Sequence, residues 1–156
     1  KKVRGDIMKK ILLAVDGSKE STRAAAKAAE IAEATKAKVS IITVLETGDI
    51  KLREVEAYIP EKTIEELREI NKEELKEKGN KYINEATQYF EDRNIKPKKI
   101  IKVGDPADEI CNYAEQEDFD MIVLADKGMG GVKRFFLGSI SSKVVRHANK
   151  SVLVVK

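Results

Sequence analysis

The sequence contains no tryptophan and only one cysteine among its 156 residues. Without tryptophan, the chain cannot form a tryptophan cage for sugars or quaternary ammonium groups. Because Cys111 has no second cysteine to pair with, an internal disulfide is excluded. The sequence also has no secretory signal, so we expect a protein of the reducing cytoplasm, with Cys111 as a core residue.

Aromatic residues and long apolar runs are also scarce. Aromatic side chains make up 5% of the sequence, which argues against a surface that stacks nucleic-acid bases. No apolar run approaches the roughly 20 residues that a membrane-spanning helix needs. No His and Cys residues have zinc-site spacing. The acidic group Asp105, Asp108 and Glu109 is best explained by stabilisation of a helix N-terminus, so we predict no protein-built metal site.

The composition is typical of one globular domain. Hydrophobic residues make up 42% and charged residues 37% of the chain, which provides a core together with a well-solvated surface. Residues 1–7 show no periodicity, and we expect them to form an N-terminal extension. The expected domain spans residues 8–156 and begins at Met8.

Short apolar runs of strand length alternate with helical patterns. The runs lie at residues 11–15, 39–45, 99–103, 121–125 and 151–155. Helical patterns follow Ser18, Pro60, Pro106 and Gly138, where capping or helix-starting residues occur. Nearly continuous apolar runs are typical of strands covered on both faces, and alternation with helices predicts a parallel sheet. The expected fold class is therefore α/β, with five parallel strands and helices on both faces.

Residues 61–93 have the pattern of one long charged helix, with a possible interruption near Gly79. Oppositely charged residues recur three or four positions apart, for example Glu69 with Lys72 and Glu74 with Lys78, so they are spaced to pair. This pattern favours a solvated helix surface over a partner-binding coiled coil.

Charge is distributed unevenly along the chain. Residues 127–156 contain seven lysines and arginines and no Asp or Glu, whereas the whole chain has a net charge of +3. A local positive field of this kind favours an anionic partner for the C-terminal third. The charge by itself is equally compatible with a merely basic surface.

Two turns follow strands at the edge where open α/β sheets bind ligands. The first contains Asp16 after the run at 11–15, and an Asp in this position can also simply stabilise a turn. The second contains three glycines after the run at 121–125, then Gly138 and Ser139 at the start of a helix. Glycines allow backbone N–H groups to approach an oxyanion, and a helix N-terminus favours negative charge. Lys127 adds positive charge, so this turn favours phosphate binding over an ordinary glycine turn.

The run GMGGVKRFFLGS, which follows MIVLADK, resembles the nucleotide loop of universal stress proteins. That family's pattern is a glycine, two residues, a glycine, nine residues, and a glycine followed by serine or threonine. Gly128, Gly138 and Ser139 match the last three defined positions, and Ala125 stands at the first. The segment VGDP at 103–106 and the terminal SVLVVK also resemble the family, so that the resemblance extends from Met8 to Lys156.

The resemblance implies a Rossmann-like open sheet with strand order 3-2-1-4-5 and a site for ATP, or for AMP or ADP. It implies that Asp16 contacts the adenosine, that the backbone of Val44 contacts the adenine, and that a Mg²⁺ or Mn²⁺ ion accompanies the phosphates. It also implies a homodimer through residues 151–155. The implied nucleotide-binding residues are Ala14, Val15, Asp16, Val44, Ala125, Lys127, Gly128, Gly131, Gly138, Ser139 and Ile140.

Other functions remain open from the sequence. A universal stress protein that acts only through protein contacts is compatible with Ala125 at the first loop position. An ATP-activating enzyme would be expected to have a serine- and glycine-rich loop after the first strand, where this chain has only DGSKES, and the Walker spacing is absent. A receiver domain is conceivable from Asp16 after a strand, but it would need a second acidic residue beside a phosphoacceptor aspartate, and the sequence places none. No motif places a general base at the terminal phosphate, so we expect a regulatory module with at most slow ATP hydrolysis.

Overall fold

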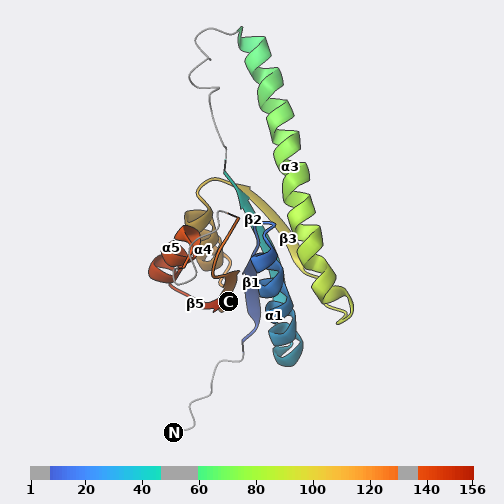
Figure 1. Cartoon of the computed structure of the whole chain (residues 1–156), viewed down its shortest axis with the longest axis vertical. Helices are drawn as coiled ribbons and strands as arrows, with labels where there is room; N and C mark the ends of the chain where they lie inside the picture. The colour runs from blue at the N-terminus through green and yellow to red at the C-terminus, as the bar shows by residue number, and fades with distance from the viewer. Residues whose placement is uncertain (1–7, 47–59, 130–136) are drawn as a thin grey trace.

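A computed structural model describes residues 8–46, 60–129 and 137–156 (Figure 1). The described strands form one sheet in the order β3-β2-β1-β4-β5, and every neighbouring pair is parallel. The predicted fold class and strand order are therefore confirmed. The strands are β1 Lys10–Ala14, β2 Lys38–Leu45, β3 Lys98–Val103, β4 Met121–Ala125 and β5 Ser151–Val155.

Helices cover both faces of the sheet. Helices α1 (Lys19–Thr35) and α3 (Glu61–Glu91) pack on one face, and α4 (Pro106–Gln116) and α5 (Ser139–His147) pack on the other (Figure 1). Each face has its own apolar cluster, because side chains along a strand alternate between the two sides. The central strand β1 contributes to both clusters, and its Ile11, Leu12 and Leu13 are fully buried. Among the described residues, no helix is both long and apolar enough to span a membrane.

Local sequence explains where the helices begin. The side chain of Ser18 accepts a hydrogen bond from the Ser21 N–H, and Asp105 accepts one from the Asp108 N–H, so both residues cap their helices as expected. Cys111 is half-buried against the α4–α5 cluster, at the margin of the core, and burial raises the pKa of its thiol.

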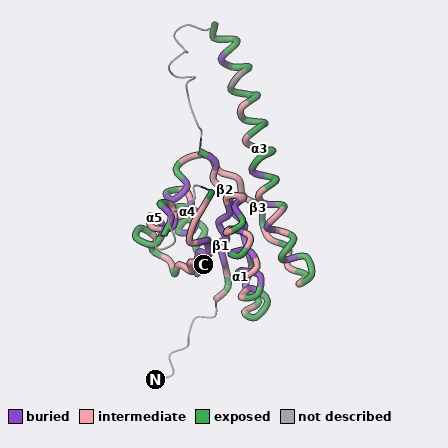
Figure 2. Tube along the Cα trace, viewed as in Figure 1, coloured by how far each residue is buried: buried purple, intermediate pink, exposed green. Residues whose placement is uncertain are grey.

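Helix α3 continues through Gly79, so the predicted interruption is wrong. Gly79 is buried, and a Cβ atom there would lie 3.0 Å from the Ile101 side chain, which means that the glycine allows α3 to approach β3 closely. The C-terminal half packs through Ile83 and Phe90, both fully buried. The N-terminal half extends beyond the sheet, and Ile70 is 56% exposed there (Figures 1 and 2).

Candidate functional site

The described residues form a cavity of about 470 Å³ at the carboxyl ends of β1, β2 and β4, which we call the switch-point cavity. Strand β1 lies between β2 and β4, so the chain reverses its direction along the sheet at this point, where open α/β proteins bind ligands. Gly131 lies outside the described residues. The other ten predicted nucleotide-binding residues all line the cavity: Ala14, Val15, Asp16, Val44, Ala125, Lys127, Gly128, Gly138, Ser139 and Ile140.

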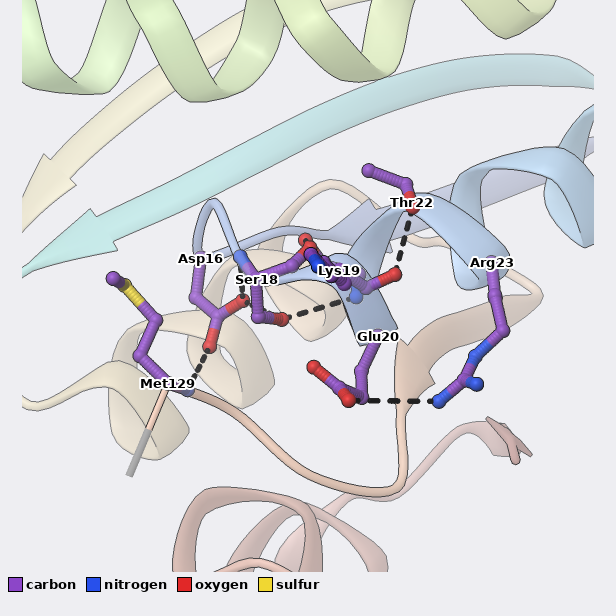
Figure 3. Close-up of polar contacts among 8 residues, drawn as sticks. Asp16, Ser18, Lys19, Glu20, Thr22, Arg23 and Met129 are labelled. Carbon is purple, nitrogen blue, oxygen red and sulfur yellow. Dashed lines mark hydrogen bonds and ion pairs between the residues drawn. The ribbon is translucent and has the colours of Figure 1, made fainter. Parts of the chain in front are cut away.

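Asp16 joins the turn after β1 to the loop after β4 (Figure 3). One carboxylate oxygen, Oδ1, accepts hydrogen bonds from the N–H of Ser18 at 3.0 Å and from its hydroxyl at 2.6 Å. The other oxygen, Oδ2, accepts one from the N–H of Met129 at 3.2 Å. The carboxylate thus fixes two loops on the same rim of the cavity, although Asp16 and Met129 are far apart in sequence.

Two glycines permit this close approach. Gly17 has φ +79°, and a Cβ atom there would lie 2.2 Å from the Tyr82 ring, so only glycine fits. A Cβ atom on Gly128 would lie 2.5 Å from Asp16 Oδ2 and would displace the carboxylate. Both loops therefore require a bare backbone where they meet.

The N-terminus of α5 lines the cavity with backbone N–H groups that have no acceptor within the helix. Gly138 is the N-cap residue and supplies no side-chain cap, unlike Ser18 at α1 and Asp105 at α4. The first hydrogen bond inside the helix runs from the Ser142 N–H to the Gly138 carbonyl at 2.9 Å, so the N–H groups of residues 139–141 have no partner within the helix. Free N–H groups and the helix dipole make this end favourable for an anion.

The same helix is anchored to the end of β4. The Ser141 hydroxyl donates to the Ala125 carbonyl at 2.8 Å, and the Gly138 N–H donates to the Asp126 carbonyl at 2.7 Å. Ala125 is the last residue of β4 and is not among the described residues with positive φ, so alanine fits this position without strain. The alanine at the first position of the glycine pattern therefore causes no backbone strain at the end of β4.

Val44 lies on β2 just beyond the point where β1 ends, so its backbone faces the cavity. The Val15 N–H donates to the Ile42 carbonyl, and Leu45 accepts from the Gly104 N–H on the β3 side. Since backbone groups alternate along a strand, the N–H and carbonyl of Val44 point towards β1. The chain turns away at Gly17, and within the described residues no backbone group pairs with them. A donor and an acceptor therefore stand side by side.

The described lining of the cavity carries equal numbers of acidic and basic side chains. The described lining includes the carboxylates of Asp16 and Glu46 and the ammonium groups of Lys78 and Lys127. Lys143 of α5 instead pairs with Asp105 and Asp108 of α4, each at 3.0 Å. These interactions raise the pKa of Lys143, chiefly through its hydrogen bond to Asp108, so its charge is held at the α4–α5 contact.

Sequence reasoning missed the helices that wall the cavity. Lys78 and Tyr82 of α3 line it from one side, and Pro106 and Ile110 of α4 line it from the other. The sequence held one signal for the first pair, because residues four apart on a helix share a face. Nothing in the local sequence indicated which face of α3 meets the loops.

The fold and the site place the chain among doubly wound α/β proteins with a ligand crevice at the switch point of the sheet. The model of the universal stress protein family matches residues 8–156, and the chain belongs to this family. Over 149 residues it is 32% identical to universal stress protein YxiE of Bacillus subtilis (strain 168), covering 94% of this chain and 98% of that protein. Over 154 residues it is 33% identical to universal stress protein MJ0577 of Methanocaldococcus jannaschii, covering 95% of this chain and 94% of that protein.

Solved structures of this family share the architecture. The structure of MJ0577 has a TM-score of 0.74 at 31% identity, and the match covers 96% of each chain. A universal stress protein in complex with cAMP has a TM-score of 0.62 at 24% identity, covering 96% of this chain and 97% of that one. The universal stress protein of Archaeoglobus fulgidus in complex with dAMP has a TM-score of 0.61 at 23% identity, covering 96% of this chain and 99% of that one. The resemblance found in the sequence is confirmed.

Proposed function

We propose that this universal stress protein binds ATP in the switch-point cavity and acts as a regulatory module. The observation that carries the proposal is that two sets of backbone groups, at Val44 and at the start of α5, meet in one cavity and have no backbone partner among the described residues. The N–H and carbonyl of Val44 suit the edge of a base, and the N–H groups at the start of α5 suit phosphates. Two other proteins of this fold were solved with cAMP and dAMP, so the architecture accommodates adenine nucleotides.

The base would bind against the end of β2. Adenine presents an amine donor beside a ring-nitrogen acceptor, which complements the carbonyl and N–H of Val44. Guanine presents an acceptor where adenine has the amine, so the same backbone pair disfavours it. Apolar side chains of the lining, including Ala14, Ile110 and Ile140, would enclose the ring, as in most small-molecule sites.

The phosphates would bind between Gly128 and the start of α5. The N–H groups of Ser139 and Ile140, the hydroxyl of Ser139 and the nearby ammonium of Lys127 supply donors and positive charge. Asp16 would contact the ribose from the opposite loop. Gly131, which lies outside the described residues, remains a sequence-based prediction for the same loop.

A divalent ion would be bound by the phosphates rather than by a protein site. Among the described residues, no group of three or more His, Cys, Asp and Glu side chains could hold a metal ion. Mg²⁺ commonly binds through substrate phosphates with few protein ligands, and Mn²⁺ accepts the same oxygen donors. With no general base placed by motif at the terminal phosphate, we propose binding with at most slow hydrolysis.

Ligand-dependent stabilisation tests the proposal. Mg-ATP at 100 times its dissociation constant is expected to raise the free energy of unfolding by about 2.7 kcal/mol, which corresponds to a Tm increase of roughly 5–10 °C. Mg-GTP at the same concentration is the matched control and should give a smaller increase, because its base does not complement Val44. Differential scanning calorimetry with each nucleotide measures both shifts. No shift with millimolar Mg-ATP would contradict nucleotide binding and favour a member that acts only through protein contacts.

We also propose a homodimer formed through β5. This strand lies at the edge of the sheet, and Asp126 donates to the Val155 carbonyl, so the backbone of Val155 faces β4. By alternation, the backbone groups of Val152 and Val154 face outwards. Unpaired strand edges are normally covered or paired, and a second β5 strand would satisfy these groups.

Substitution Val154→Pro is expected to convert the dimer into a monomer, because proline removes an outward N–H without touching the β4–β5 hydrogen bonds. Val154→Ala is the control, since it shortens the same side chain and keeps the donor. Multi-angle light scattering at micromolar concentration should report a dimer for the unsubstituted chain and for Val154→Ala. A monomeric unsubstituted chain would refute the dimer.

A further inference from the structure

Helix α3 forms one wall of the switch-point cavity through Lys78 and Tyr82, which lie one turn apart on the same face. The Tyr82 ring lies directly against Gly17, where a Cβ atom would be only 2.2 Å from it. The Tyr82 hydroxyl donates to the sulfur of Met129 at 3.7 Å, a weak contact with the loop after β4. Tyr82 therefore touches both loops that Asp16 connects.

Those contacts place α3 beside the groups assigned to the phosphates. Met129 directly follows Gly128, and a Cβ atom on Gly138 would lie 3.7 Å from the Gly128 nitrogen. Tyr82, the loop after β4 and the start of α5 thus form a continuous series of contacts across the cavity mouth. One long side chain next to Tyr82 on α3 lines the same cavity as Ser139 and Ile140 at the start of α5.

Lys78 is that side chain. Its ammonium group lies 5.9 Å from the centre of the Tyr82 ring, at the outer limit of a cation–π contact. Although the spacing with Glu74 predicts an ion pair, Lys78 forms none with any carboxylate in the part of the chain that the structure describes. Lys143 of α5, by contrast, is held by Asp105 and Asp108. Lys78 thus lines the cavity with its charge available to a ligand.

A buried hydroxyl on β2 also favours a ligand on this side. Thr43 lines the cavity and is 1% exposed, and its Oγ1 has no hydrogen-bond partner within the described residues. It follows Ile42 of the α4–α5 cluster, so alternation directs it to the α1–α3 side of the sheet. Buried hydroxyl groups are normally paired, and a polar ligand group on the α3 side would satisfy this one.

We propose that Lys78 binds the phosphate chain of the nucleotide from the α3 side, opposite the α5 amides, and that Tyr82 positions it. This inference rests on the proposed function and adds to it a determinant of phosphate-chain length. An ammonium group forms strong charge-assisted hydrogen bonds with phosphate oxyanions. With the phosphate nearest the ribose held by the amides of α5, Lys78 would contact the outer phosphates that AMP lacks, and it therefore favours ATP over AMP.

Titration calorimetry of the full chain with Mg-ATP and with AMP tests this selectivity. Lys78→Gln is expected to weaken Mg-ATP binding about 3- to 5-fold, the upper range for a solvent-accessible charge contact, and AMP binding less than about 2-fold. Lys78→Arg keeps the charge and should retain most of the affinity for Mg-ATP. Lys81→Gln is the matched control, because Lys81 is an exposed lysine of α3 outside the cavity lining, and it should leave both affinities unchanged.

The outcomes separate this inference from the function on which it rests. If the unsubstituted chain binds Mg-ATP but Lys78→Gln behaves like Lys81→Gln, the role of Lys78 is refuted and nucleotide binding stands. An equal loss of Mg-ATP and AMP affinity in Lys78→Gln also refutes the role in chain-length selection. If the unsubstituted chain binds neither nucleotide, the proposed function fails and the inference fails with it.

Discussion

Replacement of Asp16 by alanine is expected to lower the affinity for Mg-ATP about 10- to 100-fold. A hydrogen bond to a charged group contributes about 1.5–3 kcal/mol, and each 1.4 kcal/mol corresponds to a factor of ten in affinity. The substitution removes the proposed ribose contact, and it also releases Met129 from the carboxylate. Because Met129 follows Gly128, the loop assigned to the phosphates loses its link to the turn after β1.

Asp16→Asn separates the two parts of this effect. The asparagine carbonyl oxygen can still accept from the N–H and hydroxyl of Ser18, so the turn before α1 should keep its geometry. Its amide NH₂ group cannot accept the hydrogen bond from the Met129 N–H. We therefore expect near-normal stability in urea but weakened Mg-ATP binding in calorimetry. Affinity equal to that of the unsubstituted chain in both variants would contradict the role of the Asp16 bridge.

Phe90→Ala is expected to give the largest loss of stability, about 3–5 kcal/mol. Phe90 is fully buried in the cluster between α1, α3 and the sheet, and truncation leaves a cavity that neighbouring side chains fill only in part. Domains of this size are typically stable by about 5–15 kcal/mol, so the variant would keep only part of its stability. Urea unfolding followed by circular dichroism measures the change.

Tyr89→Ala provides the matched control for this prediction. Tyr89 is the adjacent aromatic residue of α3 and is 37% exposed. Its truncation therefore removes less buried apolar surface than that of Phe90. Its loss should cost clearly less than that of Phe90. Equal losses in the two variants would contradict the prediction that the buried Phe90 contributes more to stability than the exposed Tyr89.

The elements that the sequence predicted best are those defined by local chemistry. The runs at 121–125 and 151–155 match β4 and β5, because short apolar stretches bounded by polar residues allow little else in a sheet covered on both faces. Ser18 and the residues Asp105 and Pro106 mark helix starts whose capping hydrogen bonds lie within the first turn of the helix. Strand β1 begins and ends one residue before the run at 11–15, a difference that is normal for the ends of secondary-structure elements.

The parts that the sequence did not predict depend on contacts between distant segments. Gly79 is compatible with either a helix break or close helix–strand packing, and only the position of Ile101 decides between them. Asp16 could be placed in a turn, but its second bond goes to Met129 across the cavity. The cavity wall formed by α3 was not predicted for the same reason, because tertiary packing decides which face of this helix meets the loops.

The length of α3 has a mechanical consequence. At 1.5 Å per residue, its 31 residues form a rod of about 46 Å, and roughly 31 Å of it separates Tyr82 from Glu61. A tilt of about 5° at Tyr82 therefore displaces the far end by roughly 3 Å, many times the displacement at the pivot. A small movement of α3 at the cavity would thus be magnified at its N-terminal end, which extends beyond the sheet.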